Sequence, residues 1–523
     1  MNRAEDSDRW VRTVSCKLSP PSLKDNTADV DRLNKSIEKK LRTDRVSIGL
    51  SFVRRIPSLL RENRYEVCPL LYQDRGGWHL IDIYPSCTDL SMYGLGVDIG
   101  SSTVVVRLMD LMSGELIEEI SFLNPQNETG PDILTRIHFA SQEGGLDRLR
   151  TLLIEKLNQE IAKVAKRNGI GASAVVGLSV AGNTTMTHLF LGLDPYWICR
   201  EPYIPVINRP ELLRAADLDI EIHREAPALV FPNVGSYCGG DLIAGVLASG
   251  MAESDELSIL VDVGTNAEVV IGNREWLMAC AGAAGPALEG GVASMGMMAG
   301  PGVIDKVRID AASGQFSMRT IENKPPIGIC GSGLIDLVAQ FFLVGMIDLR
   351  GKFVVNRCGD RLKEMDGVKH FVVVHSQDSG RGEDLTLSQP DIDALIRSKA
   401  AMYTILTTIT HMLNVSTKDI SRFYIAGTFG SYIDPESAIT LGMIPDLPIE
   451  TYKPLGNTAL TGAVIALLSA AARDQIYGIR DRITYVELNV NQEFMNLFSA
   501  AKFIPHTDRS LFPSVQPPVQ KWG

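Results

Sequence analysis

The sequence predicts an α/β fold with two lobes, each built on the same strand–turn–strand unit, and a small α/β domain before the first lobe. Two stretches carry this prediction: residues 94–106 read GLGVDIGSSTVVV, and residues 260–271 read LVDVGTNAEVVI. Each is a run of strand formers that ends in an Asp and a Gly turn before a second strand begins. The chain has 523 residues, too many for one compact core, so two or three domains are expected. Strand patterns also alternate with helical patterns, which is typical of the α/β class.

The repeated turns have the composition of phosphate-binding loops. In the first copy Asp98 is followed by Gly100, Ser101, Ser102 and Thr103, and in the second Asp262 is followed by Gly264, Thr265 and Asn266. Gly lets backbone N–H groups approach phosphate oxygens, and Ser, Thr and Asn add side-chain donors. The carboxylates cannot face phosphate directly. We therefore expect Asp98 and Asp262 to hold Mg²⁺, which needs only one or two carboxylates besides phosphates and water.

One such match alone is more often an ordinary turn. Two copies with the same flanking strands instead predict that both loops close on one ATP molecule.

Composition excludes some classes of partner. The net charge is −11 and no basic tract is present, which argues against nucleic acid as a principal partner. The longest apolar runs, such as AVIALLSAAA from residue 463, are too short to span a bilayer and predict buried helix. The N-terminal residues MNRAEDSDRW are charged and contain no apolar signal region. We therefore expect a cytoplasmic protein without a membrane segment.

The eight cysteines show no metal-binding spacing. No two of them lie within five residues of each other, whereas zinc and iron–sulfur sites usually contain at least one close pair. The sequence therefore predicts buried, reduced thiols and no iron–sulfur cluster in this chain.

The predicted domains follow from where the patterns change. Residues 1–92 form the small N-terminal domain, 93–258 the first lobe, 259–480 the second lobe, and 481–523 a C-terminal return segment and tail.

Several elements of the lobes can be predicted individually. Alternating residues predict a hairpin after the first loop, with its turn at Ser113-Gly114. Residues 146–167 have a helical pattern that ends at Asn168-Gly169. AVVGLSVAGN, at 174–183, predicts a buried strand.

Asp241, in the sequence GGD, stands at the start of a predicted helix beside a Gly-rich turn. A carboxylate there could position or deprotonate the water that attacks a γ-phosphate. The alternative is that Asp241 is only a helix N-cap.

Other Gly-rich turns allow a nucleotide to approach the backbone. Gly427 and Gly430, in AGTFGS, lie at a strand-to-helix junction and could approach a ribose or α-phosphate. Gly331 and Ser332, in GICGSGLIDLV, open a helix whose free N–H groups could contact a nucleotide or simply pack. Glu289, in AAGPALEGG, is as compatible with a structural role as with a functional one.

A polar cluster follows the predicted hairpin. NPQ at 124–126 and GPDILTRI at 130–137 contain Gln126, Asp132 and Arg136. These side chains could line a cleft or form a solvated loop and helix start, and the sequence does not decide between the two. His138 and His188 are isolated, which favours structural roles.

The order of these motifs resembles the acetate and sugar kinase/Hsp70/actin superfamily, and within it the reductive activators of corrinoid proteins. The resemblance extends from about residue 10 to 505. The stretches that carry it include YGLGVDIGSSTVVV, SFLNPQNETGPDILTRI, GGDLIAG, VDVGTNAEVV, AGPALEGG, GICGSGLIDLV and FYIAGTFGSYIDPESAITLGMIPD. It implies an actin-like ATPase with duplicated ribonuclease H-like lobes.

The resemblance also implies an activity and roles for residues. Members of the family use ATP to drive reduction of Co(II) to Co(I) in a corrinoid protein. By resemblance, Asp98 and Asp262 would hold Mg²⁺ and phosphate, Asp241 would be the catalytic carboxylate, and Gly427, Thr428 and Gly430 would lie beside the adenosine. A homodimer is also compatible with the family.

The sequence departs from the family in one respect. These activators usually carry an iron–sulfur domain, and the cysteine spacing here fits no such cluster. We therefore expect electrons from a separate donor, such as a ferredoxin-like protein, or else that the chain is a fragment without its cluster domain. Two other functions remain open: a small-molecule kinase on the same fold, and a nucleotide-dependent binding module.

Overall fold

The structure of the chain is a computed structural model. It describes residues 8–88, 90–264, 266–283, 285, 293–310, 313–427, 433–488 and 492–516. The chain forms two compact units, of which the first consists of Met1–Ala248 with Ala459–Asp481 and the second of Ser249–Thr458 with Arg482–Gly523. Each unit has its own sheets and its own hydrophobic core.

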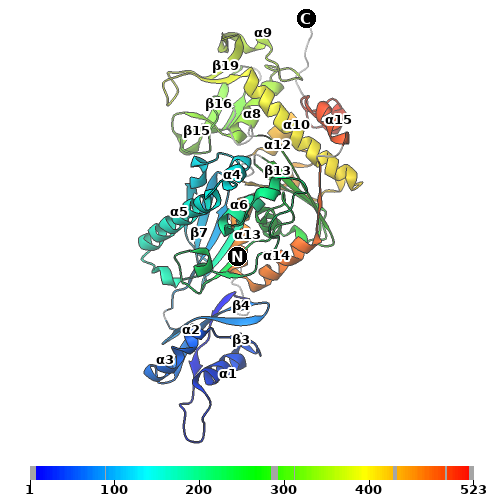
Figure 1. Ribbon diagram of the computed structural model, residues 1–523. Coiled ribbons are helices and arrows are strands. Elements are labelled where there is room, and N and C mark those ends of the chain that lie inside the picture. Colours follow the sequence, from blue (N-terminus) through cyan, green and yellow to red (C-terminus); the bar gives the residue numbers. More distant parts are fainter. Residues whose placement is uncertain are drawn as a thin grey trace. The chain divides into compact units, whose positions relative to one another are not determined.

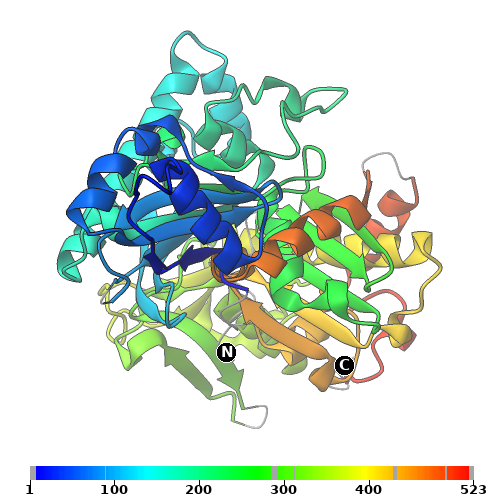
Figure 2. The same cartoon turned by 90° about the horizontal axis from the view of Figure 1, so that it is seen from below.

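The first unit begins with the predicted small α/β domain, drawn in blue in Figure 1 and Figure 2. Its strands are β1 (Val11–Thr13), β2 (Cys16–Lys17), β3 (Val46–Ser47), β4 (Glu66–Asp74) and β5 (Gly77–Tyr84), and its helices are α1 (Asp29–Leu41), α2 (Leu50–Val53) and α3 (Ile56–Glu62). The strands form one five-stranded sheet. Leu33, Ile37 and Leu60 of the helices are buried in one core with Leu71 of β4.

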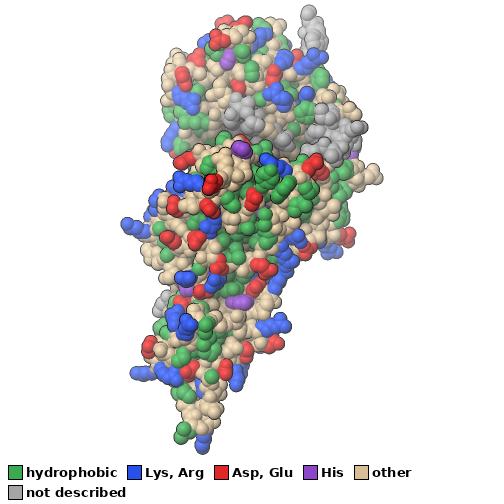
Figure 3. Space-filling view, in the orientation of Figure 1, with side chains coloured by type: hydrophobic (Ala, Val, Ile, Leu, Met, Phe, Trp, Pro, Cys, Tyr) green, Lys and Arg blue, Asp and Glu red, His purple; other side chains and the backbone are tan. Residues whose placement is uncertain are grey.

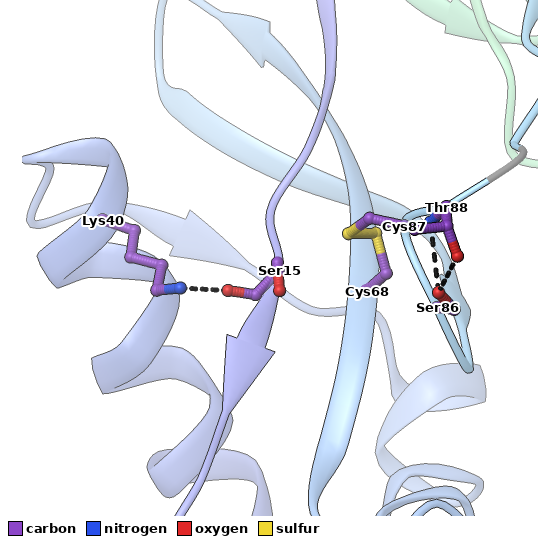
Figure 4. Close-up of a disulfide and its surroundings, with 6 residues drawn as sticks. All are labelled: Ser15, Lys40, Cys68, Ser86, Cys87 and Thr88. Atoms are coloured by element: carbon purple, nitrogen blue, oxygen red, sulfur yellow. Dashed lines mark hydrogen bonds between the residues drawn. A yellow bond between two sulfur atoms is a disulfide. The ribbon is translucent and has the colours of Figure 1, made fainter.

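A disulfide in this domain corrects the cysteine prediction. Cys68 of β4 bonds Cys87, which follows β5, with 5.3 Å between the two Cα atoms (Figure 4). Because β4 and β5 are antiparallel and Cys68 lies opposite Tyr84, the chain leaving β5 passes beside Cys68. This proximity depends on strand pairing, and a search for closely spaced cysteines cannot detect it. Among the remaining cysteines Cys199 is partly exposed, and the other five are buried free thiols as predicted.

The first lobe is built on a six-stranded sheet with the order β10-β11-β9-β6-β7-β8. Strands β6, β7 and β8 are antiparallel neighbours, and β9 and β11 continue the sheet in parallel with β6. The predicted hairpin after the first loop is confirmed. The bounds are β6 (Tyr93–Ile99), β7 (Thr103–Asp110), β8 (Leu116–Leu123), β9 (Val175–Gly182), β10 (Leu213–Arg214) and β11 (Pro227–Val230).

The second unit repeats this arrangement. Its large sheet has the order β22-β21-β12-β13-β14-β23. Again three consecutive strands, β12 to β14, are antiparallel, and two later strands, β21 and β22, extend the sheet in parallel. The bounds are β12 (Ser258–Val263), β13 (Asn266–Gly272), β14 (Leu277–Ala283), β21 (Arg422–Ala426), β22 (Tyr452–Gly456) and β23 (Ile483–Val486). The duplication read from two short stretches is therefore a duplication of sheet topology.

Two smaller sheets complete the second unit. One contains β15 (Val303–Ile309), β16 (Phe316–Thr320) and β17 (Gly328–Ile329), and the other β18 (Leu362–Met365), β19 (Val368–Val374) and β20 (Leu385–Ser388).

The helices follow the alternation that the sequence predicts. In the first unit they include α4 (Ile133–Ala140), α5 (Gly145–Arg167), α6 (Thr184–Leu191) and α7 (Gly240–Ser249). In the second they include α8 (Gly331–Leu343), α9 (Val355–Cys358), α10 (Gln389–Met412), α12 (Pro435–Leu441) and α15 (Gln492–Ala501). The predicted helix at 146–167 is α5, which ends at Arg167 with Asn168 as its C-cap. Among the described residues, no helix is long and apolar enough to cross a membrane.

Two helices late in the sequence, α13 (Thr458–Leu468) and α14 (Ala470–Arg482), return almost entirely to the first unit. Glycines in β6 make room for α13. A Cβ on Gly96 would lie 2.7 Å from Cγ2 of Val464, and one on Gly94 would lie 2.9 Å from Cδ1 of Leu467. Both distances are shorter than van der Waals contact, so a side chain at either position would require these side chains of α13 to move.

Figure 3 shows acidic and basic side chains interspersed over the described part of the face that it draws.

Candidate functional site

The first candidate loop joins β6 to β7. Asp98 lies one residue before the end of β6, where it pairs with Val105 of β7 and Ala181 of β9. A Cβ on Gly100 would lie 2.5 Å from the carbonyl oxygen of Thr103, so the tight turn requires Gly at that position. The hydroxyl of Thr103 is buried and has no hydrogen-bond partner among the described residues. The loop therefore contains a buried hydroxyl that no described residue satisfies.

Residues of the polar cluster after β8 donate hydrogen bonds to the backbone carbonyls of this loop. Asn124 donates from Nδ2 to the carbonyl of Gly100 at 3.0 Å and from its backbone N–H to the carbonyl of Ser102 at 2.9 Å. Arg136 donates to the carbonyl of Ser101 at 2.7 Å, and Asn127 donates to that of Ser102 at 3.2 Å. Three consecutive loop carbonyls are thus bound by side chains of the cluster, which fixes the loop backbone in one conformation.

The sequence left open whether this cluster lines a cleft or forms a solvated loop and helix start, and the answer differs between its residues. Gln126 and Arg136 are fully buried, and they form part of the support under the loop. Asp132 is exposed and caps α4, accepting a hydrogen bond from the backbone N–H of Thr135 at 2.9 Å.

Asn183 connects the first loop to β9, the neighbouring strand of the sheet. It was not predicted from the sequence as a site residue. It follows β9 directly. Its Nδ2 donates to the hydroxyl of Ser101 at 3.1 Å, and its Oδ1 caps α6 by accepting from the backbone N–H of Met186 at 2.9 Å. The available signal was an Asn between a buried strand and a helix, a position that usually indicates only a cap.

Asp241 lies at the start of α7, close to this connection. A Cβ on Gly239 would lie 2.5 Å from both the Cα of Asn183 and Oδ1 of Asp241. Oδ1 accepts a hydrogen bond from the backbone N–H of Leu242 at 2.8 Å. Burial raises the pKa of Asp241 to about 6, against the opposing effect of backbone hydrogen bonds. The structure therefore brings the first loop and Asp241 to one edge of the sheet, with Asn183 between them.

The second candidate loop joins β12 to β13 in the second unit. Asp262 pairs with Glu268 of β13 and Ala426 of β21. The turn closes through a 2.9 Å hydrogen bond from the backbone N–H of Gly264 to the carbonyl of Asn266. Thr265 lies outside the described residues.

Gly427 follows β21 and lies against this loop. Its φ is +85°, and a Cβ there would lie 2.9 Å from Oδ1 of Asp262. Both the conformation and the space require Gly. The structure therefore brings together two predicted site residues, Asp262 and Gly427, that are far apart in the sequence. Thr428, Gly430 and Glu289 lie outside the described residues.

Gly331 and Ser332 form the first turn of α8 and are both buried. The hydroxyl of Ser332 lies 3.2 Å from Sγ of Cys330. The turn packs on β15, since a Cβ on Gly333 would lie 2.4 Å from the carbonyl oxygen of Ile304. Contact of Gly331 and Ser332 with a nucleotide stays a prediction.

Three family models match consecutive parts of the chain. The RACo linker region matches residues 3–89, the RACo middle region residues 93–254, and the C-terminal domain of RACo, the ASKHA domain, residues 256–516.

Individual relatives agree with these matches. The corrinoid activation enzyme RamQ of Eubacterium limosum is 31% identical over 431 residues, which are 81% of this chain and 72% of the relative. The [Co(II) methylated amine-specific corrinoid protein] reductase of Methanosarcina barkeri is 22% identical over 445 residues, 78% of this chain and 76% of the relative. A solved structure of a reductive activator for corrinoid, iron–sulfur protein superposes with a TM-score of 0.90 at 37% identity, covering 97% of this chain and 81% of that one.

Proposed function

We propose that this chain, which belongs to the RACo family of reductive activators of corrinoid proteins, uses ATP binding and hydrolysis to promote the reduction of Co(II) to Co(I) in a corrinoid protein. The observation that carries the proposal is similarity over nearly the whole chain, at 37% identity and a TM-score of 0.90, to a reductive activator of known structure. Similarity of this extent includes both loops and the segments that support them.

The first loop supports the ATP-binding part of the proposal. Its backbone carbonyls accept hydrogen bonds from the side chains of Asn124, Asn127 and Arg136. Its turn admits only Gly at position 100, and the hydroxyl of Thr103 has no protein partner among the described residues. A loop whose carbonyls are already bound suits a phosphate group, because its backbone N–H groups need little reorganisation when the anion arrives.

Asp98 and Asp262 would hold Mg²⁺, directly or through water, since each lies at the turn of a loop whose other groups are donors. Phosphate would be bound by Gly100, Ser101, Ser102, Thr103, Gly264, Thr265 and Asn266, and other parts of the nucleotide by Gly331, Ser332, Gly427, Thr428 and Gly430.

Asp241 would accept the proton of the attacking water. Its pKa of about 6 suits this role, because a general base works best when its pKa is close to the working pH.

ATP takes no part in cobalt chemistry, so its contribution must be conformational. Nucleotide binding and hydrolysis would favour one conformation of the activator over another, and that conformation would change the docking or the cobalt ligation of the corrinoid protein. Electrons would come from a separate donor such as a ferredoxin-like protein.

The proposal is tested by measuring phosphate release from MgATP by the pure protein, with and without a Co(II) corrinoid protein. In parallel, the Co(I) absorbance is followed with a low-potential reductant present. We expect hydrolysis to be stimulated by the corrinoid protein and Co(I) to accumulate only when ATP is present. A rate of hydrolysis that is the same with and without the corrinoid protein would indicate a kinase or a nucleotide-dependent binding module. Failure to bind ATP would overturn the proposal.

A variant pair sharpens this test. Asp241→Asn should abolish most of the hydrolysis. Asp147→Asn, which changes an exposed carboxylate on α5, should leave it unchanged.

A further inference from the structure

Arg136 is a charged group buried where charge is costly. Its side chain is fully inaccessible to solvent. Burial lowers its pKa to about 10, so the guanidinium remains a cation at neutral pH. A buried cation is strongly unfavourable unless an anion compensates it.

The hydrogen-bond partners of Arg136 are all neutral. Nε donates to the carbonyl of Gly130 at 2.9 Å, and one terminal nitrogen donates to Oε1 of Gln126 at 3.4 Å and lies 3.3 Å from Sδ of Met186. The other terminal nitrogen donates to the carbonyl of Ser101 at 2.7 Å and to Oδ1 of Asn127.

The nearby carboxylate of Asp132 does not neutralise Arg136. Asp132 acts on it only at a distance, and its two oxygens accept hydrogen bonds from the backbone N–H and hydroxyl of Thr135. Among the described residues, no carboxylate forms an ion pair with Arg136. The positive charge is therefore paired with carbonyl and amide dipoles only.

The position of this charge indicates what compensates it. The guanidinium donates a hydrogen bond to the carbonyl of Ser101, the central residue of the first loop. A phosphate on the loop would lie across one peptide unit from this buried cation, and a charge held away from solvent is screened less than one at the surface.

We propose that Arg136 is the specificity-determining cation of the first loop, selecting nucleotides with several phosphates over those with few. It acts through the loop without touching the ligand, so it is a positioning and selecting residue. This inference rests on the proposed function, because it presupposes that the loop binds the phosphates of ATP.

The test compares dissociation constants for ATP, ADP, AMP and adenosine, with Mg²⁺ present, in the full chain and its variants. In Arg136→Met we expect affinity to fall about thirtyfold for ATP, less for ADP, and by no more than about twofold for adenosine, since the lost interaction scales with ligand charge. An equal loss for all four ligands would show a purely structural role and overturn the inference, as would unchanged affinity for ATP.

Two further variants separate charge from packing. Arg136→Lys keeps the charge and loses part of the hydrogen-bond network, so the ratio of ATP to adenosine affinity should stay near that of the unaltered protein. A clear fall in the ratio of ATP to adenosine affinity in Arg136→Lys would contradict the proposal. The Arg136→Lys variant therefore tests the proposal even if Arg136→Met does not fold.

Arg473→Met is the matched control. Arg473 is also a buried arginine of the first unit that donates to a carbonyl, that of Gln73, and its pKa is lowered to about 10 by burial. This variant should lose stability without changing the ratio. If the unaltered protein binds none of the four ligands, the proposed function itself fails, which is distinct from a failure that appears only in the Arg136 variants.

Discussion

Asn183 donates a 3.1 Å hydrogen bond from its side-chain amide to the hydroxyl of Ser101, joining the end of β9 to the first hairpin loop. The second unit repeats this strand pairing. Asp98 lies opposite Ala181, which Gly182 and Asn183 follow, and Asp262 lies opposite Ala426, which Gly427 follows. In both units an Asp at the turn of a hairpin is therefore paired with an Ala of the neighbouring parallel strand, and a Gly comes directly after that Ala.

Replacing Asn183 by Ala should weaken ATP binding several-fold and destabilise the protein by about 1 kcal/mol, because the variant loses both the Ser101 contact and the cap of α6. The measurements are the ATP dissociation constant and the free energy of unfolding. Asn158→Ala is the control, since Asn158 makes two hydrogen bonds in the same unit, to Asp219 and Glu221. Equal ATP affinity in the two variants would contradict a role for Asn183 at the site.

Replacing Gly427 by Ala should reduce ATP hydrolysis at least about tenfold. The new Cβ would lie 2.9 Å from Oδ1 of Asp262 and displace that carboxylate, and the positive φ adds about 1–2 kcal/mol of strain. Gly382→Ala separates these effects, because Gly382 also has a positive φ, +72°, but nothing lies within 4 Å of its Cβ position. Normal hydrolysis in Gly427→Ala, or the same loss in both variants, would count against the placement of Asp262.

The pH dependence of stability should reveal the raised pKa of Asp241. Its pKa is about 6 in the folded protein and about 4 when unfolded, so the folded state binds the extra proton between these values. Stability from this group is therefore present below pH 4 and is lost as the pH rises towards 6. Asp241→Asn should accordingly be more stable than the unaltered protein at pH 7, by roughly 2–3 kcal/mol for a difference of about two pKa units, with the difference vanishing near pH 4. Denaturant unfolding across this range measures it, and a constant difference would refute the assignment.

The same residue should set the pH profile of hydrolysis. The rate should rise as the pH increases through about 6 and level off above it, because only the ionised carboxylate can accept a proton. In Asp241→Asn the rate of hydrolysis should fall by a factor of about 10²–10⁴. The rate of this variant should also no longer rise with pH. A variant that keeps the same profile at reduced rate would place the titrating group elsewhere.

Reduction of the Cys68–Cys87 disulfide should destabilise the N-terminal domain by about 3 kcal/mol, because the bond closes a loop with a sequence separation of 19. Thermal unfolding with and without a phosphine reductant measures the effect, and Cys68→Ser should reproduce it. Cys199→Ser is the control, since Cys199 is a free thiol. A reductant effect that persists in Cys68→Ser would have to come from another source.

Local patterns were sufficient for much of the fold. The two hairpins with Asp at the turn, the helix over Gly145–Arg167 and the buried strand before Asn183 all follow from periodicity and turn composition within a short window. The repeat indicated two similar lobes, but the strand order within each sheet came from the structure. The same local patterns singled out Asp98, Asp241 and Asp262.

Contacts between distant parts of the chain were decided by the tertiary structure alone. No spacing rule joins Arg136 to Ser101, Asn183 to Ser101, or Cys68 to Cys87, because strand pairing and helix packing create these contacts. The return of α13 to the glycines of β6 likewise depends on matching shapes. The sequence by itself determined which groups could bind phosphate and metal. The packing of the sheet determined which neutral and charged side chains hold those groups in place, since a hydrogen bond depends on distance in space and not on separation along the chain.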